Sequence, residues 1–448
     1  MATLTAVLLA AGEGLRFNSK HPKLLHPLAG WPMLDYGLAM AEAAGASKIY
    51  LVVPSLNHPV AKHAGKRVIP VAQSKPLGSA DAVKKALQAS KASGDLLVLY
   101  GDVPLLRPQT VQALRQIHQL NGAAATLVTA FMADPFGYGR VVRGNDGSVI
   151  RVVEEKDCNA EERKLREING GAYLFQAALL GPALDKVGSA NAGREFYLPE
   201  VVQHLIAEGK PTQALTVPDA SEVLGVNTRQ QAAAAHRILN RRRVAEWERK
   251  GVTFLDAKTT ELGPDVELGR DTVIEGNVKI EGATKIGEDC LIESGSLIVN
   301  SKLGKGVSIL ASRIIDSVMA DDSDAGPNAH VRGGCVIGAE AHVGTGTEMK
   351  GVKFGADSKA GHFSYIGDAV IGKGVNVGAG CVFANYDGKK KHVTKVGDGA
   401  FLGSNSTLVA PVTIGSKAVV GAGAVVTKNV PAKATVVGVP AKAVGKKK

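Results

Sequence analysis

Residues suited to phosphate chemistry stand near the beginning of the chain. Residues 9–16 read Leu-Ala-Ala-Gly-Glu-Gly-Leu-Arg, and Pro22-Lys23 follows shortly afterwards. The backbone N–H groups of such a glycine-rich turn can approach a phosphate closely, and Arg16 and Lys23 can neutralise its charge. The spacing matches neither a Walker A loop nor the GxGxxG dinucleotide pattern. Taken alone, the glycines fit a tight strand-to-helix turn equally well.

A single carboxylate, Asp102, follows the apolar run at residues 96–100 after Tyr100-Gly101. An aspartate at the end of a strand is as often a helix cap or a turn residue as a metal ligand. Here Gly101 and the preceding strand favour a ligand for Mg²⁺, which prefers hard oxygen donors.

The second half of the chain carries a histidine, His362, in the segment Lys-Ala-Gly-His-Phe-Ser-Tyr at residues 359–365. A histidine whose pKa is near neutral can take a proton from an attacking amine. A lone histidine is more often structural, so its neighbours must decide between the two interpretations.

The elements that would position the first group of residues alternate between strands and helices over residues 1–227. This rhythm predicts a largely parallel, Rossmann-like sheet with helices on both faces, and ligands at the carboxyl ends of its strands. Residues 228–250 contain neither Gly nor Pro and predict a helical linker whose arginine run is a solvated face. The clearest predicted strands are 5–9, 48–53 and 96–100, and the clearest predicted helices are 33–44 and 79–92.

Residues 251–448 contain two runs in which an aliphatic residue stands at every sixth position. Such a repeat predicts a parallel β-helix, in which each coil has three short faces and buries one side chain per face. The content of 53 Gly and only 4% aromatic residues fits thin coils better than a large globular core. The repeat positions are Leu262, Leu268, Ile274, Ile280, Ile286, Ile292 and Ile298, and then Val396, Leu402, Leu408, Ile414, Val420 and Val426.

The repeat changes its spacing in two regions, 349–371 and 383–396, and we expect a site near these breaks. The steps from Met349 to Phe354 and from Ile366 to Ile371 are five residues long, and 13 residues separate Phe383 from Val396. The predicted site therefore lies on a scaffold of otherwise regular coils.

Composition narrows the classes of function. The net charge of +11 comes from scattered Lys and Arg, with short clusters at 241–243, 389–391 and 446–448 and no interleaved aromatic platform, so nucleic-acid binding is not expected. The four cysteines show no metal-ligand spacing and fit a reducing compartment. The apolar N-terminus lacks a basic segment and no run approaches ~20 apolar residues, so we expect a cytoplasmic protein without a membrane span.

The pattern LxAGxGxR followed by PKxL resembles sugar-1-phosphate nucleotidylyltransferases, which transfer a nucleotidyl group without a protein nucleophile. The resemblance implies that Arg16 and Lys23 are catalytic and that Asp102 and Asn227 hold Mg²⁺. Gln73 with Gly78 and Ser79 would form the segment that recognises the base. The other implied nucleotide- and sugar-binding residues are Leu9, Ala10, Ala11, Gly12, Tyr100, Gly101, Gly139, Glu154 and Asn169.

The repeat segment resembles hexapeptide-repeat acyltransferases, which coil left-handed. There the resemblance implies that His362 deprotonates the sugar amine, with Glu348 as a possible orienting partner, and that Arg332, Lys350 and Lys391 hold a sugar phosphate. Tyr365, Asn376, Asn385 and Tyr386 would position substrate, and Ala379, Ser404 and Ala422 would bind acetyl-CoA.

Over nearly its whole length the chain resembles the family of bifunctional N-acetylglucosamine-1-phosphate uridyltransferases/glucosamine-1-phosphate N-acetyltransferases. This resemblance implies acetyl-CoA and UTP as co-substrates, UDP-N-acetylglucosamine for the bacterial envelope as product, and a homotrimer. The chain departs from the family pattern at 78–82 (Gly-Ser-Ala-Asp-Ala for Gly-Thr-Gly-His/Thr-Ala), at 195–200, and near the end, where an Arg used toward CoA is absent. A different sugar-1-phosphate or nucleotide, or a non-catalytic regulatory subunit, are the alternatives.

Overall fold

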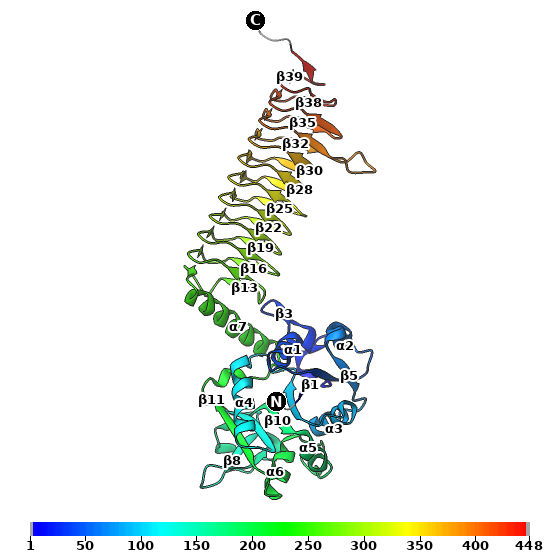
Figure 1. Ribbon diagram of the computed structural model, residues 1–448, viewed down its shortest axis with the longest axis vertical. Helices are drawn as coiled ribbons and strands as arrows, with labels where there is room; N and C mark the ends of the chain where they lie inside the picture. Colours follow the sequence, from blue (N-terminus) through cyan, green and yellow to red (C-terminus); the bar gives the residue numbers. More distant parts are fainter. Residues whose placement is uncertain (1–2, 445–448) are drawn as a thin grey trace. The chain divides into compact units, whose positions relative to one another are not determined.

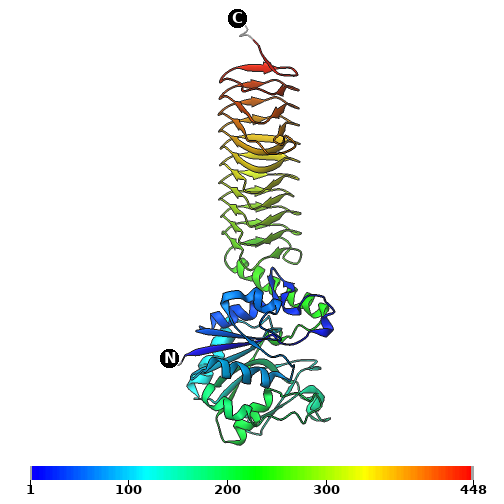
Figure 2. The ribbon, with the colours of Figure 1, turned by 90° about the vertical axis from the view of Figure 1, so that its right-hand side faces the viewer.

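The computed structural model describes residues 3–444, which form two compact units, one ending at Leu239 and the other beginning at Asn240 (Figure 1). The first unit is an α/β domain and the second is a parallel β-helix, whose stacked coils are clearest in Figure 2. The basic cluster at 446–448 lies outside the described residues.

The first unit is built on a nine-stranded sheet in the order β11-β7-β10-β6-β1-β4-β5, with β8 and β9 joined at β10. All neighbours in the main order are parallel except β10, which runs antiparallel to both β6 and β7. The predicted strands at 5–9, 48–53 and 96–100 are confirmed. The strands are β1 (Leu4–Leu9), β4 (Lys48–Val53), β5 (Ile69–Ala72), β6 (Asp95–Tyr100), β7 (Ala125–Phe131), β8 (Arg140–Arg143), β9 (Val149–Val153), β10 (Glu167–Gln176) and β11 (Thr212–Val217).

Helices cover both faces of this sheet, as the sequence predicts. The alternation along β1 separates two cores, because Ala6 and Leu8 point to one face and Val7 to the other. Helices α1 and α4 pack on the first face, and α3, α5 and α6 on the second. The helices are α1 (Met33–Ala43), α2 (Pro59–Ala64), α3 (Ser79–Ser90), α4 (Pro108–Leu120), α5 (Ala177–Leu184) and α6 (Pro199–Ala207).

The boundary between the two units falls inside helix α7 (Arg229–Arg249). Within the second unit, the Asn240 side chain donates to the carbonyl of Thr260 at 2.6 Å and accepts from the N–H of Leu262 at 2.9 Å. Arg243 donates to the carbonyl of Leu262 at 2.9 Å. The arginine run is therefore not only a solvated face, because Arg243 satisfies a backbone carbonyl of the first coil.

The coils of the second unit have three short faces. Strands of the first face form one sheet, from β12 (Thr253–Phe254) to β40 (Lys442–Ala443), and the other two faces share a sheet from β13 (Glu261–Leu262) to β38 (Val425–Val426). All thirteen predicted repeat positions are buried, which confirms the six-residue repeat. The strands used below are β25 (His330–Arg332), β26 (Val336–Ile337), β27 (His342–Thr345), β28 (Glu348–Phe354), β29 (Lys359–His362), β30 (Tyr365–Ile371), β31 (Asn376–Val377), β32 (Val382–Ala384), β34 (Phe401–Leu402) and β37 (Val419–Val420).

The five-residue steps correspond to β28 and β30, which each continue across a corner and pair with strands on two faces. Buried aliphatic residues are also five apart at Ile298 and Leu303 and at Ile314 and Met319, where the sequence predicts no site. A five-residue step is therefore a common form of this corner and does not by itself mark a site.

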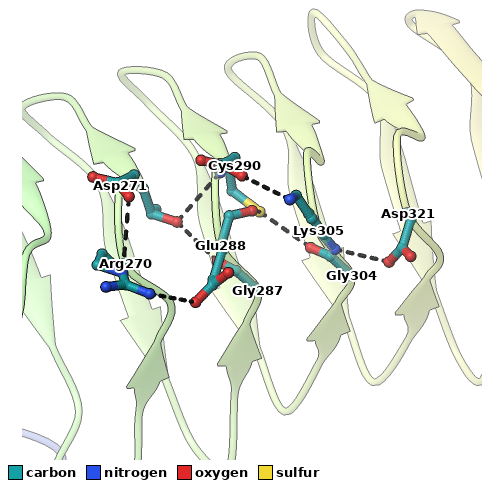
Figure 3. A network of polar contacts seen from close by, with 10 residues as sticks. Arg270, Asp271, Gly287, Glu288, Cys290, Gly304, Lys305 and Asp321 are labelled. Carbon is teal, nitrogen blue, oxygen red and sulfur yellow. Dashed lines mark hydrogen bonds and ion pairs between the residues drawn. The ribbon is translucent and has the colours of Figure 1, made fainter.

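Polar groups at one corner link successive coils in addition to the strand ladders (Figure 3). The Cys290 thiol donates to the carbonyl of Gly304 on the next coil at 3.1 Å, and burial raises the pKa of this thiol. The Lys305 N–H donates to Asp321 Oδ1 at 2.8 Å on the coil after that. At this corner, polar groups of one coil are thus satisfied by groups of the next coil.

Among residues 3–444, no helix combines the length and the apolar character needed to cross a membrane.

Candidate active sites

Three predicted residues of the first unit converge at the carboxyl end of the parallel strands. Lys23 Nζ donates to Asp102 Oδ2 at 2.7 Å and to Asn227 Oδ1 at 3.0 Å. The Val226 N–H bonds the Asp102 carbonyl at 2.8 Å, which places Asn227 beside Asp102 although 125 residues separate them. The Lys23 side chain is only 9% exposed. The predicted catalytic lysine and both predicted metal ligands therefore form one cluster.

Gly101 explains how the strand end can approach β1 so closely. A Cβ at this position would lie 2.9 Å from the carbonyl oxygen of Leu9 and 3.0 Å from the Leu24 side chain. The Gly101 N–H also donates to that same Leu9 carbonyl at 2.9 Å. A larger residue would push Asp102 away from the 3-10 helix (Lys23–Leu25) that carries Lys23.

The cluster is suited to a hard cation. Two oxygen atoms, one from a carboxylate and one from an amide, already point at a single positive charge, the Lys23 ammonium. Within the described part of the chain, no group of three or more His, Cys, Asp or Glu side chains could hold a metal. A site with two protein oxygens fits Mg²⁺, which takes its remaining ligands from water and substrate phosphates.

The glycine-rich turn lies open at the end of β1. Ala10 is fixed by an N–H bond to the Val52 carbonyl at 2.9 Å, whereas no atom lies within 4 Å of a Cβ built on Gly12. Arg16 is exposed on the 3-10 helix that follows, and among residues 3–444 it has no ion-pair partner. Arg16 is therefore free to meet an anion, but the structure does not bring it into contact with Lys23.

The predicted base-recognition residues lie together where β5 ends and α3 begins. Gln73 is buried, and its Nε2 donates to the carbonyl of Gly78 at 3.0 Å. Ser79 Oγ accepts the N–H of Leu198 at 3.0 Å, which joins this segment to the beginning of α6. Burial raises the pKa of Tyr100, whose hydroxyl bonds Ser79.

The predicted sugar-binding residues also gather in one place. The Asn169 N–H donates to the Gly139 carbonyl at 2.9 Å, and a Cβ on Gly139 would lie 3.5 Å from the Glu154 carboxyl. Burial, and then the charges of Asp157 and Glu195, raise the pKa of Glu154 to about 7. Glu154 is thus poised to exchange a proton near neutral pH.

One partner in this region was not predicted from the sequence. Asn169 Nδ2 donates to the hydroxyl of Tyr173 at 2.5 Å, and Asn169 Oδ1 accepts the N–H of Gly171 at 3.4 Å, which fixes the orientation of the amide. Tyr173 is fully buried on β10, four residues along the same strand. Nothing in the local sequence distinguishes it from an ordinary aromatic residue of the core.

A cluster of cations lies at one corner of the β-helix. Arg332 and Lys350 are register neighbours on β25 and β28. The Lys391 amino group lies within hydrogen-bonding reach of Lys350, and this contact, the charge of Lys391 and then that of Arg332 lower the pKa of Lys350. Crowded cations of this kind favour an anion of high charge, such as a phosphate ester.

Glu348 belongs to the cation cluster and not to the histidine. Its Oε1 accepts from Arg332 Nε at 3.1 Å and from Arg332 Nη2 at 2.5 Å. In the part of the chain described, the His362 ring forms no hydrogen bond. Within one chain Glu348 therefore does not orient His362, because the hydrogen bonds of its carboxylate go to Arg332.

The side chains of Asn385 and Tyr365 both lie next to Gly367. A Cβ on Gly367 would lie 2.5 Å from Asn385 Nδ2 and 2.7 Å from the Tyr365 hydroxyl. Asn385 Nδ2 donates to Asp368 Oδ2 at 2.6 Å. Gly367 thus provides the space in which these two predicted substrate contacts come together, and Asp368, which was not predicted, holds Asn385.

The thirteen-residue step contains a loop closed by its own contacts. Tyr386 and Lys391 form an antiparallel bridge, and His392 Nε2 bonds Asp387 Oδ2 at 2.6 Å. That bond lowers the pKa of Asp387, and backbone N–H groups of the loop add to the effect. The loop therefore returns Lys391 to the coil beside Lys350.

His362 lies at a different corner, in a column with the predicted acetyl-CoA residues. β29, β31, β34 and β37 are in register through Lys359, Asn376, Phe401 and Val419. Three residues further along each coil, this register aligns His362, Ala379, Ser404 and Ala422. Backbone bonds Gly380–His362, Asn405–Ala379 and Gly423–Ser404 follow the same column.

The structure does not bring the two corners into contact within one chain. Tyr365 to Gly367 of β30 separate the His362 corner from the Lys350 corner. Asn376 lies on the same face as His362 and pairs with Lys359, away from the cation cluster. The predicted acetyl-transfer residues therefore form two groups on each β-helix.

An α/β unit with a cationic, oxygen-lined site and a hexapeptide β-helix define the chain as a two-part transferase. The first part matches the MobA-like NTP transferase domain over residues 6–170, and the second matches the hexapeptide repeat of succinyl-transferase over residues 393–428. The chain is 43% identical to the bifunctional protein GlmU of Shouchella clausii, with 96% of this chain and 95% of the relative covered. It is 41% identical to the protein of that name from Acetivibrio thermocellus, over 96% and 94% of the two chains. The chain belongs to the GlmU family of bifunctional proteins.

Proposed function

We propose that this chain makes UDP-N-acetylglucosamine in two transfers. The β-helix acetylates glucosamine-1-phosphate with acetyl-CoA, and the α/β unit then couples the product to UTP and releases pyrophosphate. The observation that carries the proposal is that each unit gathers charges for a phosphorylated substrate: Lys23 between Asp102 and Asn227 in one, and Lys350 beside Arg332 and Lys391 in the other.

In the α/β unit, a phosphate oxygen of the sugar-1-phosphate attacks the α-phosphorus of UTP in line. Lys23 and Arg16 stabilise the negative charge that develops in the transition state. Asp102 and Asn227 would hold Mg²⁺, which supplies further charge neutralisation when bound. The nucleotide- and sugar-binding residues would be Leu9, Ala10, Ala11, Gly12, Gln73, Gly78, Ser79, Tyr100, Gly101, Gly139, Glu154 and Asn169.

In the β-helix, His362 takes a proton from the 2-amino group of the sugar. The nitrogen then attacks the thioester carbonyl of acetyl-CoA, and the CoA thiolate leaves with a proton. Arg332, Lys350 and Lys391 hold the sugar phosphate. Tyr365, Asn376, Asn385 and Tyr386 position the substrate, while Ala379, Ser404 and Ala422 line the binding site for acetyl-CoA.

A homotrimer is part of this proposal. Its support is a column of exposed side chains on the face that contains β23 (Val318–Met319), β26 and the last residues of β28 and β30. Three of its four register positions are valines, Val318, Val336 and Val370, and the fourth is Lys353. Apolar side chains aligned on one flat face favour contact with another copy. A neighbouring copy could also join the His362 corner to a cation cluster.

A cytoplasmic location is proposed as well. Its support is that all four cysteines, Cys158, Cys290, Cys335 and Cys381, are buried free thiols. Unpaired buried thiols are typical of proteins kept in a reducing compartment.

The test is a substrate panel that crosses sugar-1-phosphates with nucleoside triphosphates in the presence of Mg²⁺. Pyrophosphate release should be greatest with N-acetylglucosamine-1-phosphate and UTP. Activity with another pair alone would replace the substrates, and activity with no pair would favour a non-catalytic subunit. His362→Ala should abolish the use of acetyl-CoA with glucosamine-1-phosphate and leave uridylyl transfer intact. Loss of both activities would contradict two independent sites.

A further inference from the structure

The amide of Gln73 can adopt only one orientation in this structure. Its Nε2 donates to the carbonyl of Gly78 at 3.0 Å and to Asp81 Oδ2 at 2.8 Å. A backbone carbonyl and an ionised carboxylate are both acceptors and cannot donate. If the amide were reversed, Oε1 would face two acceptors, so the NH₂ group must lie on this side.

The opposite atom of the amide is available to a ligand. Within residues 3–444, Gln73 Oε1 has no hydrogen-bond partner, and it is not among the buried unpaired atoms, so it reaches solvent. The Gln73 N–H bonds the Val53 carbonyl at 2.8 Å, which fixes the backbone at the carboxyl end of the sheet. Gln73 therefore presents an acceptor, and only an acceptor, from a fixed position.

The backbone at Gly78, whose carbonyl bonds the Gln73 amide, is also fixed in position. Its φ is +117°, and a Cβ would lie 2.5 Å from the carbonyl oxygen of Phe196. The N–H of Ala80 donates to the same Phe196 carbonyl at 2.9 Å. The segments 78–82 and 195–200, both of which depart from the family pattern, thus contact each other and fix one side of Gln73.

We propose that Asp81 is a positioning residue that sets the choice of nucleobase by holding Gln73 with Oε1 toward the base. This inference rests on the proposed role of Gln73 in the uridylyl-transfer site. A base with a ring N–H between two carbonyls, as in uracil, donates to Oε1. Cytosine presents the lone pair of an unprotonated N3 at that position, and two acceptors then face each other.

Lys85 makes the effect of Asp81 testable. Its ammonium lies 2.5 Å from Asp81 Oδ1, while Asp81 Oδ2 bonds Gln73. In Asp81→Asn, Lys85 can still only donate, so the new amide turns its oxygen to Lys85 and its NH₂ to Gln73. The Gln73 NH₂ then faces another donor, which favours reversal of the Gln73 amide.

The experiment compares kcat/KM for UTP and CTP, with N-acetylglucosamine-1-phosphate and Mg²⁺, in the full chain. We expect Asp81→Asn to lower the preference for UTP over CTP by about tenfold or more, because a charge-assisted bond becomes a clash. Asp81→Ala should lower it less, since the Gly78 carbonyl still holds Nε2. Lys85→Met should leave the preference within about twofold, and Asp81→Asn with Lys85→Met should recover much of it.

These outcomes separate a positioning role from a structural one. A residue that merely stabilises α3 would make Ala the more harmful substitution, whereas the proposal requires Asn to be worse for discrimination. Melting temperature and acetyl transfer report whether each variant is folded. Equal preference in wild type and Asp81→Asn, with wild-type UTP activity present, would overturn the proposal. Absence of UTP activity in the wild type would instead refute the proposed function.

Discussion

The buried carboxyl of Glu154 gives the first unit a pH-dependent stability. Its pKa is raised from an ordinary 4.5 to about 7, mainly because burial penalises the charged form. Between these two pH values the folded chain keeps a proton that the unfolded chain has lost. The free energy of unfolding must therefore fall as pH rises through this window, by about 1.4 kcal/mol for each pH unit. The total is about 3 kcal/mol above pH 7.

Glu154→Gln is an uncharged substitution of similar shape and removes this dependence. We expect its stability relative to wild type to be unchanged near pH 4.5 and to reach a gain of about 3 kcal/mol above pH 7. The chain has two tryptophans, Trp31 and Trp247, one in each unit. In a Trp247→Phe background, fluorescence during guanidinium unfolding therefore reports the first unit alone. A difference between the two proteins that stays constant from pH 4.5 to 8 would refute this account of Glu154.

Three further predictions concern other parts of the chain. Lys23→Met should bind Mn²⁺ about tenfold more tightly without nucleotide, because the wild-type Lys23 ammonium competes with the metal for the Asp102 oxygen, and it should release pyrophosphate at least about 100-fold more slowly. Paramagnetic resonance of free Mn²⁺ measures the first effect and a pyrophosphate assay the second. An unchanged affinity for Mn²⁺ would contradict the competition. Lys391→Met should raise KM for glucosamine-1-phosphate about tenfold and weaken its dependence on salt, whereas an equal rise in KM for acetyl-CoA would argue against a phosphate contact. Ile292→Ala should destabilise the β-helix by about 2–5 kcal/mol, because it leaves a cavity in a fully buried position; unfolding followed by Trp247 in a Trp31→Phe background checks this, and a loss below about 1 kcal/mol would mean that the coils collapse to fill the space.

The sequence predicts the scaffold well, because repeats and alternating strands are local patterns. All thirteen aliphatic residues of the six-residue repeat are buried, and the strand at 48–53 has the predicted bounds. The family pattern also selects Lys23, Asp102 and Asn227, and the fold then places Lys23 Nζ 2.7 Å from Asp102 Oδ2 and 3.0 Å from Asn227 Oδ1. The family pattern does not predict that the Lys23 ammonium itself bonds both Asp102 Oδ2 and Asn227 Oδ1.

The remaining contacts depend on which side chains the fold brings face to face. Asp81 and Gln73 are eight residues apart on a helix and a strand end, so their hydrogen bond has no periodic signal. In the chain, Glu348 is 16 residues from Arg332 and 14 residues from His362, and only the structure shows that its carboxylate bonds the arginine. A five-residue step does not by itself predict a site, because Ile298 and Leu303 have the same spacing at a corner where the sequence predicts no site residue.

The number of coils sets the length of the column from His362 to Ala422. Neighbouring strands in a sheet are about 4.8 Å apart, so the three intervals between these four coils span about 14 Å. An extended substrate that binds along the column passes one coil for every strand spacing. The length of the column can therefore change only by whole coils. Removing or inserting a full coil would keep every buried residue in register and shift the far end of the column by one interval. The length of such a binding site is therefore a whole number of strand spacings, because the β-helix is built from whole coils.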